Sequence, residues 1–144
     1  MCDVLQSAGY LTSTYELTSA GTLLRSIYCE TDLICAEAIR EHAWDGLTPA
    51  ELAAVASAIT GESRKDTDHY WPPAQTEVLA DTYTDTQRIA RDIHHLENDH
   101  ELLLSRPLYG GLTTAVFQWA NGATLEECLT LAKMFGLSIT CLLY

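Results

Sequence analysis

Residues 21–66 read GTLLRSIYCETDLICAEAIREHAWDGLTPAELAAVASAITGESRKD, and their pattern predicts two packed helices joined by a short turn. In the first half, apolar and small residues recur at intervals of three and four, which gives a helix one buried face. We therefore expect a single central helix that begins after an N-cap at Thr18. Its buried face consists of Leu24, Ile27, Tyr28, Thr31, Ile34, Cys35 and Ala38, widened by Leu23, Leu33 and Ile39.

The second helix of this stretch has the clearest start signals in the chain. A turn over residues 42–46 precedes Thr48, a preferred N-cap residue, and Pro49 stands at the first helical position. Glu51 is placed to complete a capping box with Thr48. The following sequence, LAAVASAI, is rich in small residues that let another helix approach closely, and we expect this helix to end near Gly61.

Helices are also predicted on both sides of this stretch. A short one covers residues 3–9, a long one runs from about Gln75 to Leu104, and two more cover residues 110–119 and 124–134. The last of these begins with a second capping box, Thr124 with Glu127. The apolar face predicted for the long helix consists of Leu79, Thr86, Ile89, Ile93, Leu96, His100 and Leu103.

These patterns predict an all-α protein with a single domain, a bundle of about six helices. Strand-like alternation never lasts more than a few residues. We expect an N-terminal lead-in over residues 1–17, the bundle over residues 18–134, and an apolar tail over residues 135–144. The loop over residues 67–75 contains Pro72-Pro73, which cannot continue a helix.

The composition favours a globular protein of the cytoplasm. Hydrophobic residues make up 47% of the 144 residues, and the net charge is −12, from 20 acidic and 8 basic side chains. This charge argues against strong autonomous binding to nucleic acid or to an anionic membrane, because both depend on Lys and Arg. The chain has neither the basic start of a signal peptide nor an apolar stretch of membrane-spanning length, so we expect no membrane association.

The five cysteines do not form a metal-binding or disulfide framework in the sequence. They are Cys2, Cys29, Cys35, Cys128 and Cys141, with no CxxC pair among them. Cys29 and Cys35 are six residues apart within the predicted central helix, a spacing that suits neither a disulfide nor paired ligation of a metal. We therefore expect free thiols that pack as small apolar groups.

No catalytic or cofactor motif is present in the sequence. We find no GxxxxGK[ST] or GxGxxG phosphate-binding loop and no GxSxG nucleophile motif. Glu97 and His100 have the ExxH spacing of di-iron carboxylate bundles, but such sites need a second copy and two further Glu residues, and only one copy occurs. We therefore predict no catalytic residue, no metal and no cofactor in this chain.

Charged residues on the predicted central helix allow two interpretations. Glu37 and Arg40 have the i,i+3 spacing of an ion pair, and Glu30 and Asp32 lie on the same helix. One interpretation is a structural ion-pair network that fixes the helix register. The other is that part of this face lines a docking surface or a nucleic-acid path.

An ordered series of short motifs identifies a family. The series reads LTxxG, IYxExDL, AExxR, WxxLxPxELAA and ExR, followed by RP, by WAxG and by a capped Leu-Glu-Glu helix. These motifs occupy Leu17-Thr18, Gly21, Ile27-Tyr28, Glu30, Asp32-Leu33, Ala36-Glu37, Arg40, Trp44, Leu47, Pro49, residues 51–54, Glu62, Arg64, Arg106-Pro107, Trp119-Ala120, Gly122 and residues 125–127.

With these motifs the chain resembles the DSHCT domain, the C-terminal helical domain of superkiller- and HelY-type superfamily 2 helicases. The resemblance extends from about Leu11 to Leu129. It implies a helical accessory domain that packs on two RecA-like motor domains and helps to guide an RNA strand, without catalysis of its own. ATP and Mg²⁺ would bind to the motor domains of the parent helicase. The alternative is a helical protein-interaction or oligomerisation module that makes no contact with nucleic acid.

The resemblance also indicates where the strand would be contacted. In the family, the Glu of the ExR motif lies near the RNA path, so Glu62 is the best contact candidate, with Arg64 and Lys65 nearby. A carboxylate there would accept hydrogen bonds from base edges or a ribose 2′-hydroxyl. The alternative, that Glu62 only forms a salt bridge with Arg64 or Arg40, stays open.

The C-terminus departs from the family pattern. The family continues into a long basic helix that grips the strand, whereas residues 133–144 read KMFGLSITCLLY. We therefore expect a truncated or aberrant tail, weak binding of RNA by this chain alone, and possible self-association through the tail.

Overall fold

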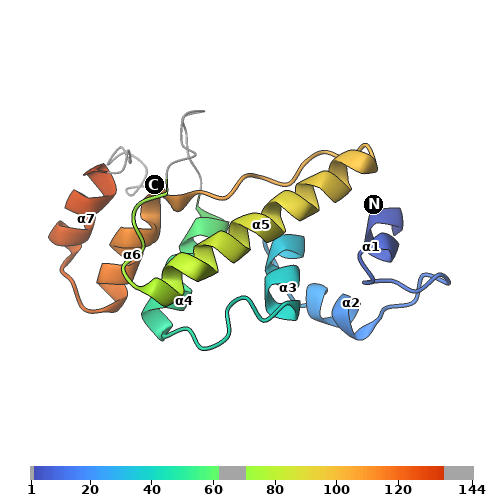
Figure 1. Cartoon of the computed structure of the whole chain (residues 1–144), viewed down its shortest axis with the longest axis horizontal. Helices are drawn as coiled ribbons and strands as arrows, with labels where there is room; N and C mark the ends of the chain where they lie inside the picture. Colours follow the sequence, from blue (N-terminus) through green and yellow to red (C-terminus); the bar gives the residue numbers. More distant parts are fainter. Residues whose placement is uncertain (1, 62–70, 135–144) are drawn as a thin grey trace. The chain divides into compact units, whose positions relative to one another are not determined.

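The computed structural model describes residues 2–61 and 71–134, and within them the all-α prediction is confirmed (Figure 1). These residues contain a single isolated β-bridge, between Leu11 and Leu17, and no strand. In chain order the helices are α1 (Cys2–Ser7), α2 (Ser19–Leu24), α3 (Asp32–Arg40), α4 (Pro49–Thr60), α5 (Glu77–Asp99), the 3₁₀ turn η1 (Gly110–Leu112), α6 (Thr113–Ala120) and α7 (Leu125–Met134).

The chain forms two compact units. The first unit contains Met1–Ala43 and Asp85–Pro107, and the second contains Trp44–Thr84 and Leu108–Tyr144. Helix α5 contributes its N-terminal part to the second unit and its C-terminal part to the first. The domain boundaries predicted after residues 17 and 134 stay predictions.

The predicted central helix is interrupted, and this is the main error in the sequence-based prediction. The N-cap is confirmed, because the Gly21 N–H donates to Thr18 Oγ1 over 3.1 Å. Helix α2 nevertheless ends at Leu24, and α3 begins only at Asp32. In between, the Ser26 N–H and hydroxyl both donate to the Leu23 carbonyl, over 2.9 and 2.6 Å, and close a turn after α2. Tyr28 is consequently 95% exposed instead of buried.

The core of the first unit is built around α3. Helix α1 ends as predicted near Gly9, whose φ of +79° reverses the chain. Tyr10 follows at once and is only 1% exposed. The buried apolar residues of this unit are Val4, Tyr10, Leu33, Ile34, Ala36, Ala38, Ile89, Ala90 and Ile93.

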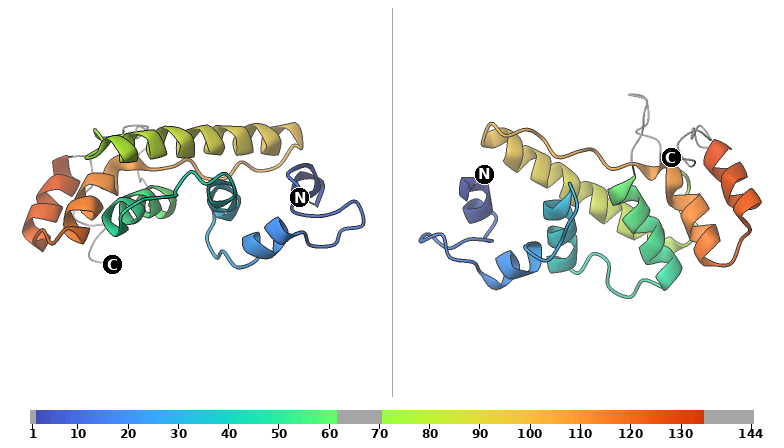
Figure 2. Two further views of the ribbon diagram at one scale, coloured as in Figure 1. Left: turned by 60° about the horizontal axis from the view of Figure 1, so that its bottom comes forward. Right: turned by 180° about the vertical axis from the view of Figure 1, so that it is seen from behind.

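The second unit is built on the close approach of α4 and α6, as the small residues of α4 predict (Figures 1 and 2). Ala54 and Ala58 are fully buried, and the Ala58 carbonyl accepts a hydrogen bond from the Tyr109 N–H over 2.9 Å. Gly110 has no room for a side chain, since a Cβ would lie 2.8 Å from ring carbons of Trp71. Helix α7 packs on α6, where Ala115, Cys128 and Ala132 form a small core.

Helix α5 is shorter than predicted. Leu79, Thr86, Ile89 and Ile93 are buried as expected, but the helix ends at Asp99 instead of Leu104. Leu103, which the periodicity places on the buried face, is 96% exposed. Glu101 has a φ of +53°, which ends the helical path. The side chain of Glu97 then accepts hydrogen bonds from the Ser105 N–H and hydroxyl, so the chain turns back over the last turn of α5.

Both predicted capping boxes are present. Glu51 Oε2 accepts from the Thr48 N–H over 2.8 Å, and the Glu51 N–H donates back to Thr48 Oγ1 over 3.3 Å. Thr124 and Glu127 repeat the arrangement at the start of α7. Hydrogen bonding to Thr124 lowers the pKa of the Glu127 carboxyl.

Replacing the first of these caps tests its contribution to stability. We expect Thr48→Ala to lower the free energy of unfolding by about 1 kcal/mol, because it leaves an N-terminal N–H of α4 without its acceptor. The measurement is urea unfolding followed by far-ultraviolet circular dichroism. Thr84→Ala is the matched control, since that exposed hydroxyl only donates to the Ala80 carbonyl within α5. Equal effects of the two substitutions would contradict the capping role.

Candidate functional site

The three strand-contact candidates, Glu62, Arg64 and Lys65, lie outside the described residues. Helix α4 ends at Thr60, and the N–H of the following residue, Gly61, donates to the Ser57 carbonyl over 2.9 Å. Their role therefore stays a prediction. The other charged residues that the sequence singles out lie within the described residues. Some of them are buried and bind other parts of the chain, and others are exposed.

Glu37 is the centre of a buried polar cluster in the first unit. Its side chain is on α3 and the residue is only 5% exposed. Tyr10 Oη donates to Glu37 Oε1 over 2.7 Å, and Arg40 Nη2 lies 2.9 Å from Glu37 Oε2. The Arg40 guanidinium carbon is 5.4 Å from the centre of the Tyr10 ring, and Arg40 Nη1 donates to the Ala8 carbonyl over 2.8 Å. The cluster thus ties the segment after α1 to α3.

The environment of this cluster fits a structural role. Burial raises the pKa of the Tyr10 phenol above its ordinary value, and the hydrogen bond to Glu37 raises it further. Both carboxylate oxygens of Glu37 bind groups of the protein, and the residue is too buried to be reached by a nucleic acid strand in this structure. Of the two interpretations of these charges, the geometry favours the ion-pair network for Glu37 and Arg40.

Glu30, on the same predicted face, is placed differently. Its side chain is 74% exposed, and Glu30 Oε2 lies 3.7 Å from Arg106 Nη1. Glu30 is also at the edge of a cavity of about 640 Å³ within the first unit. The cavity is lined by Val4, Leu5, Leu24, Glu30, Asp32, Leu33, Glu97, Leu102, Leu103, Leu104, Ser105 and Arg106.

Glu97 is used by the fold. Its two carboxylate oxygens accept hydrogen bonds from the N–H and the hydroxyl of Ser105, and the residue is buried. Across residues 2–61 and 71–134, no group of three or more His, Cys, Asp or Glu side chains is arranged to hold a metal ion.

Glu51 joins two segments of the second unit. Besides closing the capping box, its carboxylate accepts a hydrogen bond from the Thr76 hydroxyl, just before α5. This bond, together with those from Thr48, lowers the pKa of the Glu51 carboxyl. The Glu of the ELAA motif is therefore a structural group that fixes α4 to the start of α5.

The prediction of free thiols is confirmed for the described cysteines, but the placement of Cys29 and Cys35 in one helix is wrong. Cys29 Sγ and Cys35 Sγ lie 3.9 Å apart, because Cys29 is in the irregular segment between α2 and α3 and not in a helix. Cys2, Cys29, Cys35 and Cys128 are free thiols. The signal that could have found this pair is that, apart from Glu30, residues 26–31 have only moderate helix propensity.

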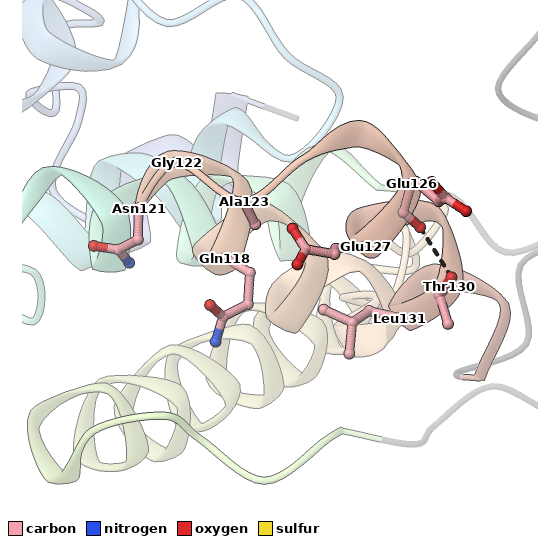
Figure 3. Close-up of a pocket in the computed structure, with 8 residues that line it drawn as sticks. All are labelled: Gln118, Asn121, Gly122, Ala123, Glu126, Glu127, Thr130 and Leu131. Atoms are coloured by element: carbon pink, nitrogen blue, oxygen red, sulfur yellow. Dashed lines mark hydrogen bonds between the residues drawn. The ribbon is translucent and has the colours of Figure 1, made fainter.

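The α6–α7 pair carries apolar side chains on its surface. Trp119, Leu125 and Met134 are 65%, 71% and 71% exposed. A cavity of about 820 Å³ opens between the two helices (Figure 3). Its lining consists of Gln118, Asn121, Gly122, Ala123, Glu126, Glu127, Thr130 and Leu131 and contains no cationic side chain. The lining thus offers amide and carboxylate groups but nothing that would attract a phosphate.

In the part of the chain that the structure describes, we find no helix with the length and hydropathy to span a bilayer. The fold and its clusters define an all-α domain in which the motif residues Glu37, Arg40 and Glu51 hold segments of the chain together. The DSHCT (NUC185) domain family matches residues 14–139. The chain belongs to this family.

Relatives of known sequence extend the comparison. The chain is 37% identical over 124 residues to "Probable helicase HelY" of Mycobacterium leprae, and 34% identical over 123 residues to the protein of that name in Mycobacterium tuberculosis strain H37Rv. These matches cover 84% and 83% of this chain but only 14% of each relative. "mRNA transport homolog 4" of Caenorhabditis elegans is 26% identical over 141 residues, which are 94% of this chain and 13% of that protein.

Proposed function

We propose that this chain is the accessory domain of an ATP-dependent helicase, that it packs on the motor domains and that it helps to guide a nucleic acid strand. The observation that carries this proposal is the family match over residues 14–139 together with relatives named as helicases. The domain itself does not hydrolyse ATP, since it has no phosphate-binding motif.

The exposed apolar residues support a docking role. Trp119 belongs to the WAxG motif and Leu125 begins the Leu-Glu-Glu helix, and both are mostly exposed. Exposed aromatic and aliphatic side chains of this size are enriched where proteins contact one another. We assign this surface of α6 and α7 to the contact with a motor domain.

The charge supports guidance of the strand rather than tight binding. With 8 basic and 20 acidic residues, the chain neutralises few phosphates, so we expect weak binding to single-stranded RNA that falls steeply with salt. Arg64 and Lys65 would supply the phosphate contacts, and Glu62 would accept a hydrogen bond from a base edge or a 2′-hydroxyl. Glu62 directly follows Gly61 in the sequence, and Arg64 and Lys65 come after Ser63.

The salt dependence of RNA binding tests this proposal. For each phosphate contact with a single strand, the slope of log K against log salt is about −0.7, so the double variant Arg64→Ala, Lys65→Ala should reduce the slope by about 1.4. The measurement is fluorescence anisotropy of a labelled single-stranded RNA over a series of salt concentrations. Glu62→Gln should leave the slope unchanged and weaken binding to RNA more than binding to DNA of the same sequence.

The control is Arg91→Ala, which removes an exposed charge on α5. A double variant that changes the slope no more than this control would refute the strand contact. Nanomolar affinity of the unchanged chain for RNA at physiological salt would also contradict the accessory role. A chain that binds no RNA at low salt but self-associates would support the interaction-module alternative. Light scattering with and without residues 135–144 then shows whether the tail is the cause.

A further inference from the structure

The contact between the two thiols depends on the break between α2 and α3. In a continuous helix, residues six positions apart are separated by about 9 Å along the axis and lie on different faces. Here Cys35 is in the first turns of α3, whereas Cys29 precedes the helix, and their sulfur atoms are 3.9 Å apart. The Thr31 hydroxyl, at 3.7 Å from Cys29 Sγ, lies beside the pair. The two thiols are therefore neighbours in space.

We propose that Cys29 and Cys35 are a modification site. The two thiols form a reversible intramolecular disulfide when a low-molecular-weight disulfide, such as oxidised glutathione, oxidises them by thiol–disulfide exchange. A disulfide bond is about 2.05 Å long, so the two sulfur atoms must approach by about 1.9 Å from their 3.9 Å separation. Cys35 is fixed by the helical bond from its N–H to the Thr31 carbonyl, 3.1 Å. Cys29, outside both helices, makes the approach.

The oxidation proceeds in two balanced exchange steps. The Cys29 thiolate attacks one sulfur of the glutathione disulfide, forms a mixed disulfide and releases one glutathione thiolate. Cys35 then gives its proton to that thiolate and attacks Cys29 Sγ, and the second glutathione leaves as a thiolate that takes up the proton released by Cys29. The protein loses two protons and two electrons, and one glutathione disulfide takes them up and becomes two glutathione thiols.

The roles of the two cysteines are not equivalent. The pKa of the Cys35 thiol is raised to about 12, mainly by burial and to a smaller extent by the neighbouring Cys29 and Asp32. Cys35 is therefore a protonated thiol at neutral pH and does not begin the reaction, because only a thiolate is nucleophilic. Cys35 reacts in the second step, in which it attacks the mixed disulfide on Cys29. Because the two residues are neighbours, this step is intramolecular and needs no second molecule of thiol.

Oxidation would restrain an exposed part of the first unit. The segment that Cys29 anchors also carries Tyr28, which is 95% exposed, and Glu30, which faces Arg106 at the edge of the cavity. A bond to Cys35 would tie this segment to α3, whose residues Leu33 and Ile34 are in the core. The redox state of the two cysteines would thus determine how firmly the exposed segment around Tyr28 is held against α3.

Trypsin provides a direct readout of the pair. Cleavage after Arg25 and Arg40 releases residues 26–40, a peptide with Cys29 and Cys35 and no other cysteine. Residues 1–25 form a second peptide with the exposed Cys2 alone. The chain is equilibrated with defined mixtures of reduced and oxidised glutathione, quenched with acid, alkylated and analysed by mass spectrometry.

We expect the 26–40 peptide to lose two hydrogens, while Cys2 gains a glutathione adduct and shows that the oxidant is active. If the fold promotes the bond, the equilibrium constant for forming the Cys29–Cys35 disulfide should be at least about tenfold higher in the native chain than in urea. The reason is that two thiols held 3.9 Å apart have a higher effective concentration than in an unfolded chain. Cys35→Ser should give a mixed glutathione disulfide on Cys29, whereas Cys29→Ser should leave Cys35 unmodified in the native chain, because the partly buried Cys35 thiol does not begin the reaction. A reduced peptide, two glutathione adducts on it, or equal constants in native and unfolded chains would overturn the proposal.

Discussion

Glu37→Ala is expected to lower the free energy of unfolding by about 3 kcal/mol, one of the two largest effects that we predict for a single substitution. The change removes the acceptor of the Tyr10 hydroxyl and the anion that faces Arg40. Breaking a buried pair leaves a polar group without compensation, which costs more than the net contribution of the pair itself. Arg40 is partly exposed, with 43% of its side chain accessible, so water limits the loss on its side.

Two further variants separate the parts of this effect. Tyr10→Phe removes only the hydroxyl that donates to Glu37 and should cost about 1 kcal/mol. The double variant should cost less than the sum of the single ones, because the two residues share one hydrogen bond. Glu30→Ala is the matched control, since the exposed pair with Arg106 at 3.7 Å should contribute less than about 1 kcal/mol.

Urea unfolding should be followed by circular dichroism and by tryptophan fluorescence together. Trp44, Trp71 and Trp119 all belong to the second unit, whereas Glu37 belongs to the first. If the two units unfold as one, Glu37→Ala shifts both transitions equally. An effect of Glu37→Ala no larger than that of Glu30→Ala would show that the buried cluster does not stabilise the first unit.

Helix starts could be predicted from the sequence because their determinants are local. Thr18, the Thr48–Glu51 box and the Thr124–Glu127 box each depend on residues three positions apart, and all three caps are present. The pairing of Glu37 with Arg40 follows from the same kind of spacing. Tyr10, the third member of that cluster, could not be found in this way, since it is 27 residues from Glu37.

The ends of α2 and α5 were the part that periodicity could not predict. The apolar pattern continues through residues 25–31 and past Asp99, but in both places polar side chains bind the backbone. Ser26 binds the Leu23 carbonyl, and Glu97 binds the Ser105 N–H. The wrong placement of Cys29 in a helix follows directly from the first of these errors. Where the strand-contact candidates Glu62, Arg64 and Lys65 are concerned, the resemblance to the family remains the only argument.

The motif residues indicate why the family pattern is ordered as it is. Glu37 and Arg40 bind the segment after α1, and Glu51 binds the segment before α5. Each of these charged groups joins its helix to a part of the chain that is distant in the sequence. The spacing of these motifs therefore reflects contacts within the domain, whereas Trp119 of the WAxG motif is mostly exposed.

Gly21→Ala is expected to have a comparably large effect, a loss of about 3 kcal/mol in the free energy of unfolding. A Cβ at this position would overlap the Tyr10 carbonyl oxygen and would lie 3.0 Å from Leu17 Cδ2. The oxygen cannot move away easily, because it accepts hydrogen bonds from the N–H and the hydroxyl of Thr18, each over 3.1 Å. Overpacking that displaces backbone costs up to about 3 kcal/mol.

The matched control is Gly46→Ala, because Gly46 has an unusual backbone conformation but no close contact. Gly46 has a φ of +75° and no atom within 4 Å of an added Cβ, so alanine there should cost only the backbone strain of about 1 kcal/mol. Gly21 is in α2 with ordinary helical geometry, so its cost measures the close approach alone. Thermal and urea unfolding of both variants decide the question. If Gly21→Ala costs no more than Gly46→Ala, the glycine of the LTxxG motif is not required by the contact of α2 with the Tyr10 backbone.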